Sequence, residues 1–198
     1  MTTQPTPQPT PIKIVLLAGW SRSGKDTAAD FLSNLHDMKK LAFADAPKIA
    51  VAEKYNFPLA WTKTQDGKSL EIQTDSGKHT VRELIIEYAM SERAKNPFSW
   101  AEVVAKQISQ SIAEGYTKFV ISDWRFLDEL IGLQRELYSI KPAIYTVRIT
   151  RVGQIISPVA DKSEYGLLGF PFWIHIFNPG DSTFFDYIDQ EISGYLTE

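Results

Sequence analysis

The chain has 198 residues, of which 43% are hydrophobic, so it can build one sizeable core and falls in the size range of a single domain. Its net charge of −3 argues against a protein whose main task is to coat nucleic acid, because such a protein carries a basic excess. The absence of cysteine excludes disulfides and thiolate metal sites, and no apolar run is long enough to span a membrane. We therefore expect a cytoplasmic protein without nucleic-acid or membrane partners.

Residues 1–11 are rich in Pro, Thr and Gln and lack the basic start and the apolar centre of a signal peptide. We expect a disordered tail there, followed by a single domain over residues 12–198. Residues 12–18 form a nearly continuous apolar run, which predicts a strand buried on both faces of a parallel sheet. Apolar residues at helical spacing predict an amphipathic helix shortly after it: Ala28, Phe31, Leu32 and Leu35.

The polar segment between this strand and this helix reads GWSRSGK at residues 19–25 and fits the phosphate-binding pattern G-x-x-x-x-G-K. In such a loop, successive backbone N–H groups and the helix N-terminus face an anion, and the lysine reaches between the β- and γ-phosphates. The segment therefore predicts binding of a nucleoside triphosphate. The expected ATP-binding residues in and just after the loop are Gly19, Ser21, Arg22, Ser23, Gly24, Lys25, Asp26 and Thr27.

One position departs from the pattern, because Asp26 stands where Ser or Thr normally holds magnesium and the hydroxyl comes one residue later at Thr27. Asp26 can accept hydrogen bonds from magnesium-bound waters, or it can simply suit the positive end of the helix dipole. We expect Mg²⁺ to accompany ATP, with Asp26, Thr27 and Asp123 as the candidate ligands, directly or through water.

Residues 39–44 predict a second strand that leads into a helix. Residues 56–79 are polar and interrupted by proline and glycine, so we expect a mobile excursion over the site. Thr80 and Glu83 fit a capping box at the start of another helix, and Ser99 is expected to cap the helix after that.

The rest of the chain continues this alternation. The remaining elements predicted from periodicity are strands at 118–123, 143–149 and 173–177 and helices at 126–137 and 182–192. The irregular residues 152–172, which contain prolines and glycines, suit a lid that closes over phosphates, although a plain surface loop is the alternative.

Candidate catalytic side chains follow the predicted strand ends. Asp123 ends a hydrophobic strand, as does the Walker-B carboxylate that organises magnesium and its waters, although it can equally be a helix cap. Arg125 and Arg151 lie just beyond strand ends, where ligands bind in an open α/β sheet. The predicted catalytic set is therefore Lys25, Asp123, Arg125 and Arg151.

Candidates for binding a phosphate acceptor lie mainly on helices. Arg82 and Arg93 are in the first turn and near the end of one predicted helix, and arginine pairs with phosphate in a bidentate manner. Lys48 follows the second strand closely and either faces the nucleotide crevice or is an ordinary surface lysine. Trp100 either stacks on a base or belongs to the core.

The order of elements predicts an α/β fold, with a doubly wound five-stranded parallel sheet and helices on both faces. The clustered cations predict phosphoryl transfer, because that reaction needs positive charge around the moving group and little covalent work by the protein. An acceptor that is itself a phosphate monoester, with a second pKa of about 6, needs no general base. This agrees with the three scattered histidines, which form no catalytic pair.

Several segments resemble the deoxynucleoside monophosphate kinases of bacteriophages and large DNA viruses, and the resemblance covers most of residues 12–193. The segments that carry it are LAGWSRSGKDTAADFL, LAFADAPK, VRELIIEYAMSERAKNPFSW, VISDWRFLDE, VRITR, DKSE and FNPGD. The resemblance implies a P-loop kinase that transfers the γ-phosphate of ATP, with magnesium, to a deoxynucleoside monophosphate. For a viral or phage protein, the compartment would be the host cytoplasm.

The resemblance also implies roles for individual residues. Arg82, Arg93 and Arg125 would lie near the acceptor or transferring phosphates, and Arg151 would belong to the closing lid. Asn178 would lie by the adenine and so adds to the expected ATP-binding residues. Asp128 and Glu129 would support the site.

Two other functions remain open. Phosphomevalonate kinases share the Ser-Gly-Lys-Asp loop, a Ser-Asp-x-Arg strand end like residues 122–125 and a Ser-Glu lid, but Asp-Thr after Lys25 and the acidic pair after Arg125 favour the nucleotide kinase. A nucleotide-binding switch or ATPase is the third function, and the clustered arginines argue against it. The sequence leaves the oligomeric state, including a homodimer, open.

Overall fold

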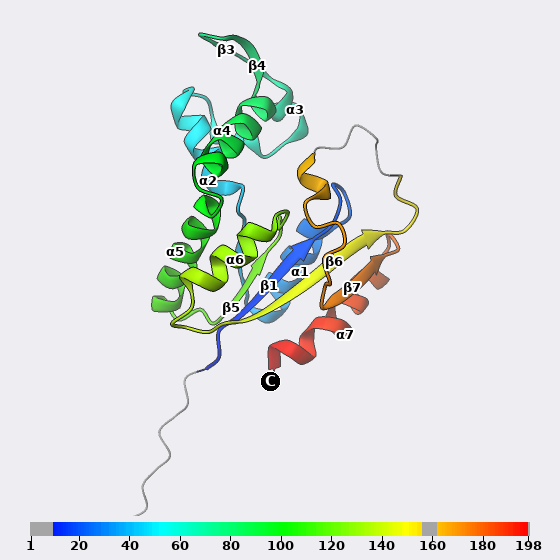
Figure 1. Cartoon of the computed structure of the whole chain (residues 1–198). Helices are drawn as coiled ribbons and strands as arrows, with labels where there is room; N and C mark the ends of the chain where they lie inside the picture. Colours follow the sequence, from blue (N-terminus) through cyan, green and yellow to red (C-terminus); the bar gives the residue numbers. More distant parts are fainter. Residues whose placement is uncertain (1–9, 156–161, 198) are drawn as a thin grey trace, which may run out of the picture.

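The computed structural model describes residues 10–155 and 162–197. Within these ranges, five parallel strands form one sheet in the order β2-β5-β1-β6-β7, which confirms the predicted doubly wound α/β fold. The strands are β1 (Lys13–Ala18), β2 (Lys39–Leu41), β5 (Lys118–Ile121), β6 (Ala143–Arg151) and β7 (Ile174–Asn178). Because all five run the same way, the segments that follow them meet at one edge of the sheet, where Figure 1 shows the strand arrowheads.

The central strand β1 explains the two-layer architecture. It pairs with β5 on one side and β6 on the other, and all six of its residues are buried. Ile14 and Leu16 belong to one hydrophobic cluster, and Val15 and Leu17 belong to another, as the alternation of side chains along a strand requires. The strand therefore contributes to a core on each face of the sheet.

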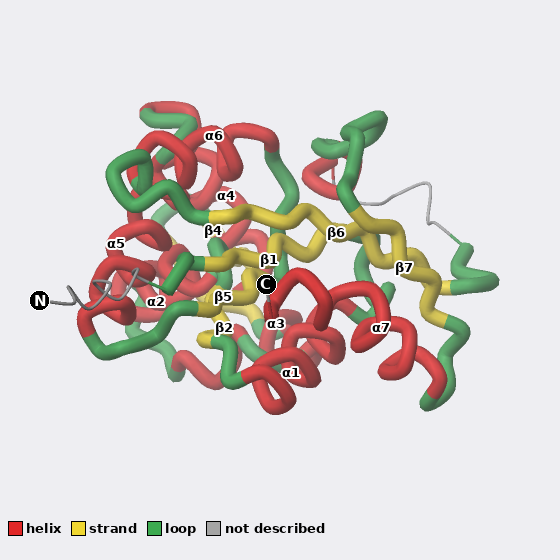
Figure 2. Tube along the Cα trace, turned by 90° about the horizontal axis from the view of Figure 1, so that it is seen from below, coloured by secondary structure: helices red, strands yellow, loops and turns green. Residues whose placement is uncertain are grey.

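Helices cover both faces (Figure 2). On one face, α1 (Lys25–His36) and α7 (Thr183–Thr197) contact each other, and their apolar residues complete the cluster that contains Val15. On the other face, α5 (Ser99–Ala113) and α6 (Leu127–Glu136) complete the cluster that contains Ile14. None of the helices in the described residues is long and apolar enough to cross a bilayer.

Residues 45–95 form an arm that stands beyond the carboxyl edge of the sheet (Figure 1). The arm has a small core of its own, to which Val51, Phe57, Val81 and Leu84 contribute. Its elements are α2 (Asp45–Lys54), η1 (Leu59–Thr62), α3 (Gln65–Ser69), β3 (Glu71–Thr74), β4 (Gly77–Thr80) and α4 (Val81–Lys95).

Residues 56–79, predicted as a mobile excursion over the site, contain regular elements. They form a 3₁₀ turn, a short helix and an antiparallel hairpin. The hairpin turn ends at Gly77, whose φ of 122° lies in the region that favours glycine. The expected mobility of the segment stays a prediction.

The two predicted helix caps have different outcomes. The capping box at the start of α4 is present, with Thr80 and Glu83 each bonding the other's backbone N–H. The prediction for α5 is wrong, because Ser99 is the first helical residue and the N-cap position is Phe98. The backbone N–H of Phe98 donates to Oδ1 of Asn96 at 3.0 Å, so an asparagine two residues upstream stabilises this turn.

The predicted lid at 152–172 lies partly outside the described residues, as does most of the predicted tail at 1–11. In the described part, a 3₁₀ turn, η2 (Lys162–Tyr165), leads into an aromatic cluster. Trp124, which follows β5, contacts Phe170 and Phe172 with ring centroids 4.9 and 5.6 Å apart. The end of this segment is therefore anchored to the main core.

We predict opposite effects on stability for two glycine substitutions in helices. In Gly132→Ala, the new Cβ would stand 2.5 Å from the Cβ of Ala101, so the α5–α6 contact must separate and the free energy of unfolding should fall by about 1–3 kcal/mol. In Gly194→Ala, the new Cβ meets nothing within 4 Å, and helix propensity should raise stability by up to about 1 kcal/mol. Urea unfolding of both variants measures the difference, and equal effects would contradict this packing at Gly132.

Candidate active site

The loop between β1 and α1 has three residues with positive φ angles. Gly19 has a φ of 147° and Gly24 a φ of 102°, and Arg22 adopts a left-handed φ of 64°. A Cβ on Gly19 would overlap the carbonyl oxygen of Ile149 in β6, and a Cβ on Gly24 would overlap the amide of Asn178 in β7. The neighbouring strands therefore fix the path of the loop.

Two buried polar side chains of the loop suit a phosphate ligand. Lys25 is buried, and its Nζ donates to the carbonyl oxygens of Gly19 and Trp20 at 2.7 and 2.8 Å, which holds the ammonium over the loop. Ser23 is fully buried, and its Oγ has no hydrogen-bond partner among the described residues. An orphaned hydroxyl beside a glycine cradle fits the binding of a polyphosphate.

Asn178 at the end of β7 is hydrogen-bonded to the backbone of the loop. Its Nδ2 donates to the carbonyl oxygen of Ser23 at 2.9 Å, and its Oδ1 accepts from the backbone N–H of Gly180 at 2.8 Å. The residue is only 4% exposed. The predicted position beside adenine stays a prediction, whereas the contact with the loop is direct.

Asp26 lies in the first turn of α1 with an exposed carboxylate, whose Oδ1 accepts from Oγ of Ser122 at 3.0 Å. Nζ of Lys40 is 3.9 Å from the same oxygen, and Thr27 is exposed on the same helix. Within residues 10–155 and 162–197, no cluster of three or more His, Asp or Glu side chains could hold a metal ion by itself. This arrangement suits a magnesium ion that takes most of its ligands from phosphates and water.

Asp123 joins the end of β5 to the start of the arm. Its two carboxylate oxygens accept from the backbone N–H groups of Phe43 and Ala44, each at 2.9 Å. Burial raises the pKa of this carboxyl, while the two backbone donors and the charges of Lys48 and Arg125 oppose the shift. Asp123 thus acts as a backbone anchor here, and its predicted role toward magnesium stays a prediction.

Glu129 at the start of α6 connects the two arginines that the sequence places near the phosphates. Its Oε1 accepts from Nη2 of Arg93 at 2.5 Å, in an ion pair whose side chains are 11% and 4% exposed. Its Oε2 accepts from the backbone N–H groups of Arg125 and Phe126 at 3.0 and 3.1 Å. The Arg93 guanidinium also lies 3.9 Å from the centroid of the Phe126 ring. Arg93 is therefore held inside the protein, where it ties the arm to the segment after β5.

The Arg125 side chain reaches toward the loop and the lid. Nη1 donates to Oγ of Ser163 at 2.7 Å, and Arg125 lines a small pocket together with Gly19 and Arg148. A Cβ on Gly166 would overlap the Arg125 carbonyl oxygen, so the segment that follows η2 is packed against this residue. Arg125 therefore lies between the loop and residues 163–166, and its predicted catalytic role stays a prediction.

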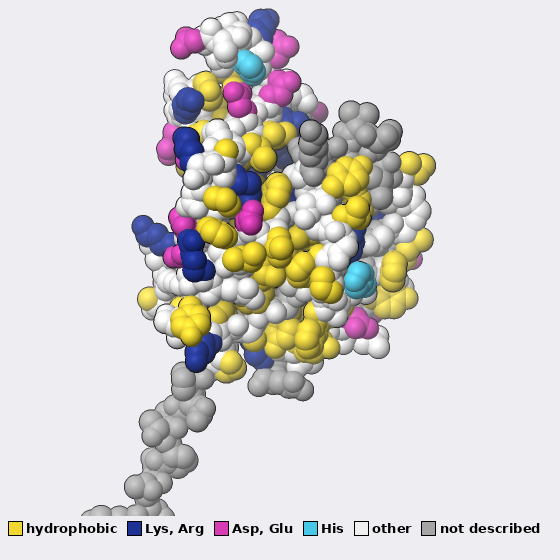
Figure 3. Space-filling view, in the orientation of Figure 1, with side chains coloured by type: hydrophobic (Ala, Val, Ile, Leu, Met, Phe, Trp, Pro, Cys, Tyr) yellow, Lys and Arg dark blue, Asp and Glu magenta, His cyan; other side chains and the backbone are white. Residues whose placement is uncertain are grey.

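Several charged side chains act electrostatically on Lys68 of the arm. Lys68 in α3 is half-buried, and its pKa is lowered, first by burial and then by the charges of Lys48, Arg82 and Arg125, while Asp26 acts in the opposite direction. These four cations come from three arm helices and the end of β5. Lysines and arginines are common on the side of the molecule formed by α4 and α5 (Figure 3). Exposure therefore does not distinguish these four cations, whereas the influence of the other three on Lys68 does.

The remaining predicted residues are more peripheral. The Arg151 guanidinium is exposed and lies beside Gly180, where Nη2 would be 3.0 Å from a Cβ. Trp100 is 8% exposed, and its Nε1 donates to the carbonyl oxygen of Ala89 at 3.2 Å. Trp100 is thus part of the core, and this placement does not favour the predicted contact with an acceptor base.

Sequence reasoning gave no role to Lys68, Ser122, Arg148 or Gln154. No sequence pattern indicates a role for Lys68, because its segment has no strong periodicity. Gln154 donates from Nε2 to the carbonyl oxygen of Ser21, a contact over 133 residues that no local pattern reveals. Arg148 lies inside β6, and only the pairing of β6 with β1 places it near the loop.

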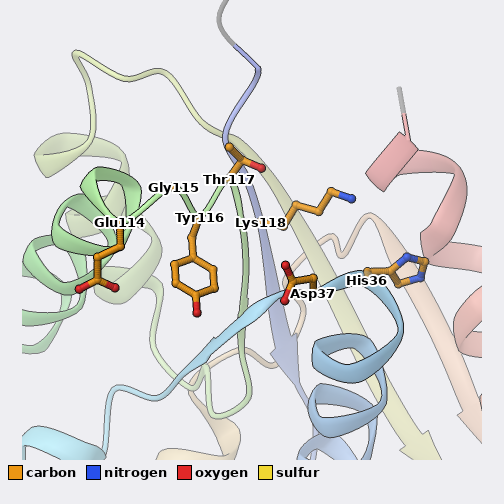
Figure 4. A pocket seen from close by; sticks show the side chains of 7 residues that line it. All are labelled: His36, Asp37, Glu114, Gly115, Tyr116, Thr117 and Lys118. Atoms are coloured by element: carbon orange, nitrogen blue, oxygen red, sulfur yellow. The ribbon is translucent and has the colours of Figure 1, made fainter.

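A surface hollow lies at the amino ends of the strands, at the opposite end of the sheet from the loop (Figure 4). It is lined by residues at the end of α1 and before and at the start of β5, among them His36, Asp37 and Tyr116. None of the predicted site residues lines it. Its position at the amino ends of the strands separates it from the edge where ligands bind in this architecture.

Comparison with known proteins matches residues 13–96 to the family described as deoxynucleotide monophosphate kinase. That range includes the loop, Lys48, Lys68, Arg82 and Arg93. The chain has no match among curated proteins.

Solved structures with a similar course of the chain include three small-molecule kinases. The Mycobacterium tuberculosis APS kinase CysC, in complex with AMPPNP and APS, is 12% identical over 96% of this chain and 100% of that one, with a TM-score of 0.48. Shikimate kinase from Bacteroides thetaiotaomicron is 12% identical over 94% and 99%, with a TM-score of 0.43. A gluconokinase from Sinorhizobium meliloti is 11% identical over 93% and 91%, also with a TM-score of 0.43.

We predict that Glu129 makes stability fall as pH rises through the neutral range. Burial raises its pKa from 4.5 to about 7, against the opposing effect of Arg93 and two backbone N–H groups. Between these values the folded protein binds more protons than the unfolded chain, so raising the pH lowers the free energy of unfolding, by roughly 1–3 kcal/mol.

Urea unfolding at about pH 5 and about pH 8 tests this prediction, because Glu129→Gln removes the titrating group. The free energy of unfolding of wild type, measured relative to that of Glu129→Gln, should be lower at about pH 8 than at about pH 5. Asp128→Asn is the matched control and should leave the pH dependence of the wild type intact. A constant difference between wild type and Glu129→Gln would show that Glu129 does not titrate in this range.

Proposed function

We propose that this chain, a dNMP-kinase-like P-loop phosphotransferase of the nucleotide kinase type, transfers the γ-phosphoryl group of ATP to the phosphate of a deoxynucleoside monophosphate. The family match supports the proposal, because it covers both the loop and the whole arm. We propose further that residues 12–198 act as one domain, in which the arm holds the acceptor and residues of about 152–172 form the lid.

The observation that carries the proposal is that Lys48, Arg82 and Arg125 all act as like charges on the half-buried Lys68, while Gln65 joins the helix of Lys68 to Arg82. A protein that only binds or hydrolyses a triphosphate needs fewer cations on the far side of the loop. Two phosphorylated substrates brought together carry enough negative charge to need them.

The donor is held by the loop. The loop backbone and Lys25 bind the β- and γ-phosphates, and the orphaned Ser23 Oγ supplies a further hydrogen bond. Asp26, which Ser122 orients, would hold magnesium through its waters, and the ion would neutralise charge on the phosphates. Asp26 is thus the residue through which the chain would position the metal.

The transfer itself depends on Arg125. Glu129 fixes its backbone, and Ser163 contacts its guanidinium, so its charge is placed before the substrates meet. A phosphate monoester acceptor is mostly a dianion at neutral pH and can attack without losing a proton. The residues described here therefore need to orient and to neutralise, and not to act as a base.

We predict that deoxynucleoside monophosphates stimulate ADP release from ATP and magnesium, and that Lys25→Ala abolishes the stimulation. The assay compares the four deoxynucleotides, their ribose forms and phosphomevalonate. Stimulation by phosphomevalonate alone would replace the proposal with the second kinase, because the Ser-Asp-x-Arg strand end serves both. Steady ADP release without any acceptor effect would point to a switch or an ATPase.

We also predict that Arg125→Ala lowers turnover by about 10²–10³-fold while ATP affinity changes little, since a lost transition-state contact affects kcat more than ground-state binding. Steady-state kinetics and calorimetric binding of ATP measure the two effects. Arg135→Ala removes an arginine that pairs with Glu102 on the surface and serves as the control. Turnover within about threefold of wild type would remove Arg125 from the catalytic set.

A further inference from the structure

We propose that Lys68 is a phosphate-binding residue of the acceptor site, and that α3 exists to hold it there. The inference rests on the proposed function and assigns a residue that the motifs leave without a role. It concerns the anionic group of the acceptor, which is a phosphate monoester dianion, and not the base.

The position of Lys68 is set by close packing of its own helix. The preceding residue, Gly67, is buried, and a Cβ there would overlap the backbone of Trp61 and come within 2.9 Å of Oγ1 of Thr64. Thr64 caps the helix by accepting from the Gly67 backbone N–H at 3.0 Å. These close contacts restrict α3 to one packing arrangement against η1.

A second contact ties α3 to the acceptor helix α4. Oε1 of Gln65 accepts from Nη2 of Arg82 at 2.6 Å, so the predicted acceptor arginine and the helix that carries Lys68 move together. The helices that carry the two cations are therefore joined, and Arg82 is one of the like charges that act on Lys68. Two neighbouring cations can bind the oxygens of one anion.

Positive charge predominates around Lys68. Lys48, Arg82 and Arg125 all act on it as like charges, and Asp26 is the carboxylate that opposes them. Lys48 pairs with Asp45 at 2.9 Å, whereas no carboxylate in the described part of the chain forms an ion pair with Lys68. A half-buried ammonium among like charges is unfavourable by itself, and a bound dianion removes that cost.

The test compares Lys68→Met with Lys78→Met, which removes the same charge from the exposed hairpin of the same arm. We expect Lys68→Met to raise KM for the deoxynucleotide by about tenfold or more, with KM for ATP within about twofold of wild type. Lys68→Arg should recover most of the affinity, because it restores the charge. Lys78→Met should match wild type in both constants.

A second measurement separates failure of this inference from failure of the proposed function. Calorimetry with inorganic phosphate, added to protein saturated with ADP, reports on the anion site without any turnover. Loss of phosphate binding in Lys68→Met but not in Lys78→Met supports the site even if no deoxynucleotide is phosphorylated.

Two outcomes would overturn the inference. One is unchanged phosphate binding and an unchanged acceptor KM in Lys68→Met. The other comes from Gly67→Ala, which should displace α3 and weaken phosphate binding while Lys68 itself is retained. If this variant folds, as shown by wild-type ATP affinity, and still binds phosphate normally, the position of α3 does not determine phosphate binding and the inference is wrong.

Discussion

The candidate site depends on how closely the loop after β1 approaches the strands beside it. Gly19 lies against the carbonyl of Ile149, and Gly24 lies against Asn178, with no space for a side chain at either place. β1 is buried on both faces and paired on both edges, so it cannot shift to relieve these contacts. The path of the loop is therefore a property of the packed sheet, and the loop needs no ligand to adopt it.

The rest of the candidate site consists of cationic side chains that are held by other residues of the protein. Most cations near the loop already have a partner within the protein: Glu129 holds Arg93, Gln65 holds Arg82 and Ser163 contacts Arg125. Such contacts fix the geometry of the guanidinium groups before a substrate arrives, which lowers the entropic cost of binding it. Because Glu129 also binds the Arg125 backbone, one carboxylate links the acceptor arm to the residue expected at the transferring phosphate.

The parts of the fold that sequence predicts are those with local signals. The loop, its strand and its helix follow from a contiguous motif, and the five-stranded sheet follows from apolar runs of the right length. In the arm, the sequence predicts α2 and α4, whereas α3, β3 and β4 give no signal because a helix of five residues and strands of four are too short to show periodicity.

The contacts that build the candidate site are, in contrast, distant in sequence. Asp123 binds residues 79 and 80 positions away, and Arg125 meets a serine 38 positions away. A sequence shows that such residues carry charge, but only the pairing of strands decides which of them meet. The same limit explains Trp100, whose helical spacing suits a core residue and an exposed aromatic equally well.

The arm has a hydrophobic core separate from the two that flank the sheet. Tyr88 packs against both this small core and the core that contains Ile14, and the buried residues of the two clusters are otherwise different. On the proposed function, donor binding and acceptor choice would be encoded in different parts of the chain. A change of acceptor would then require changes in the arm, while the ATP site on the sheet is retained.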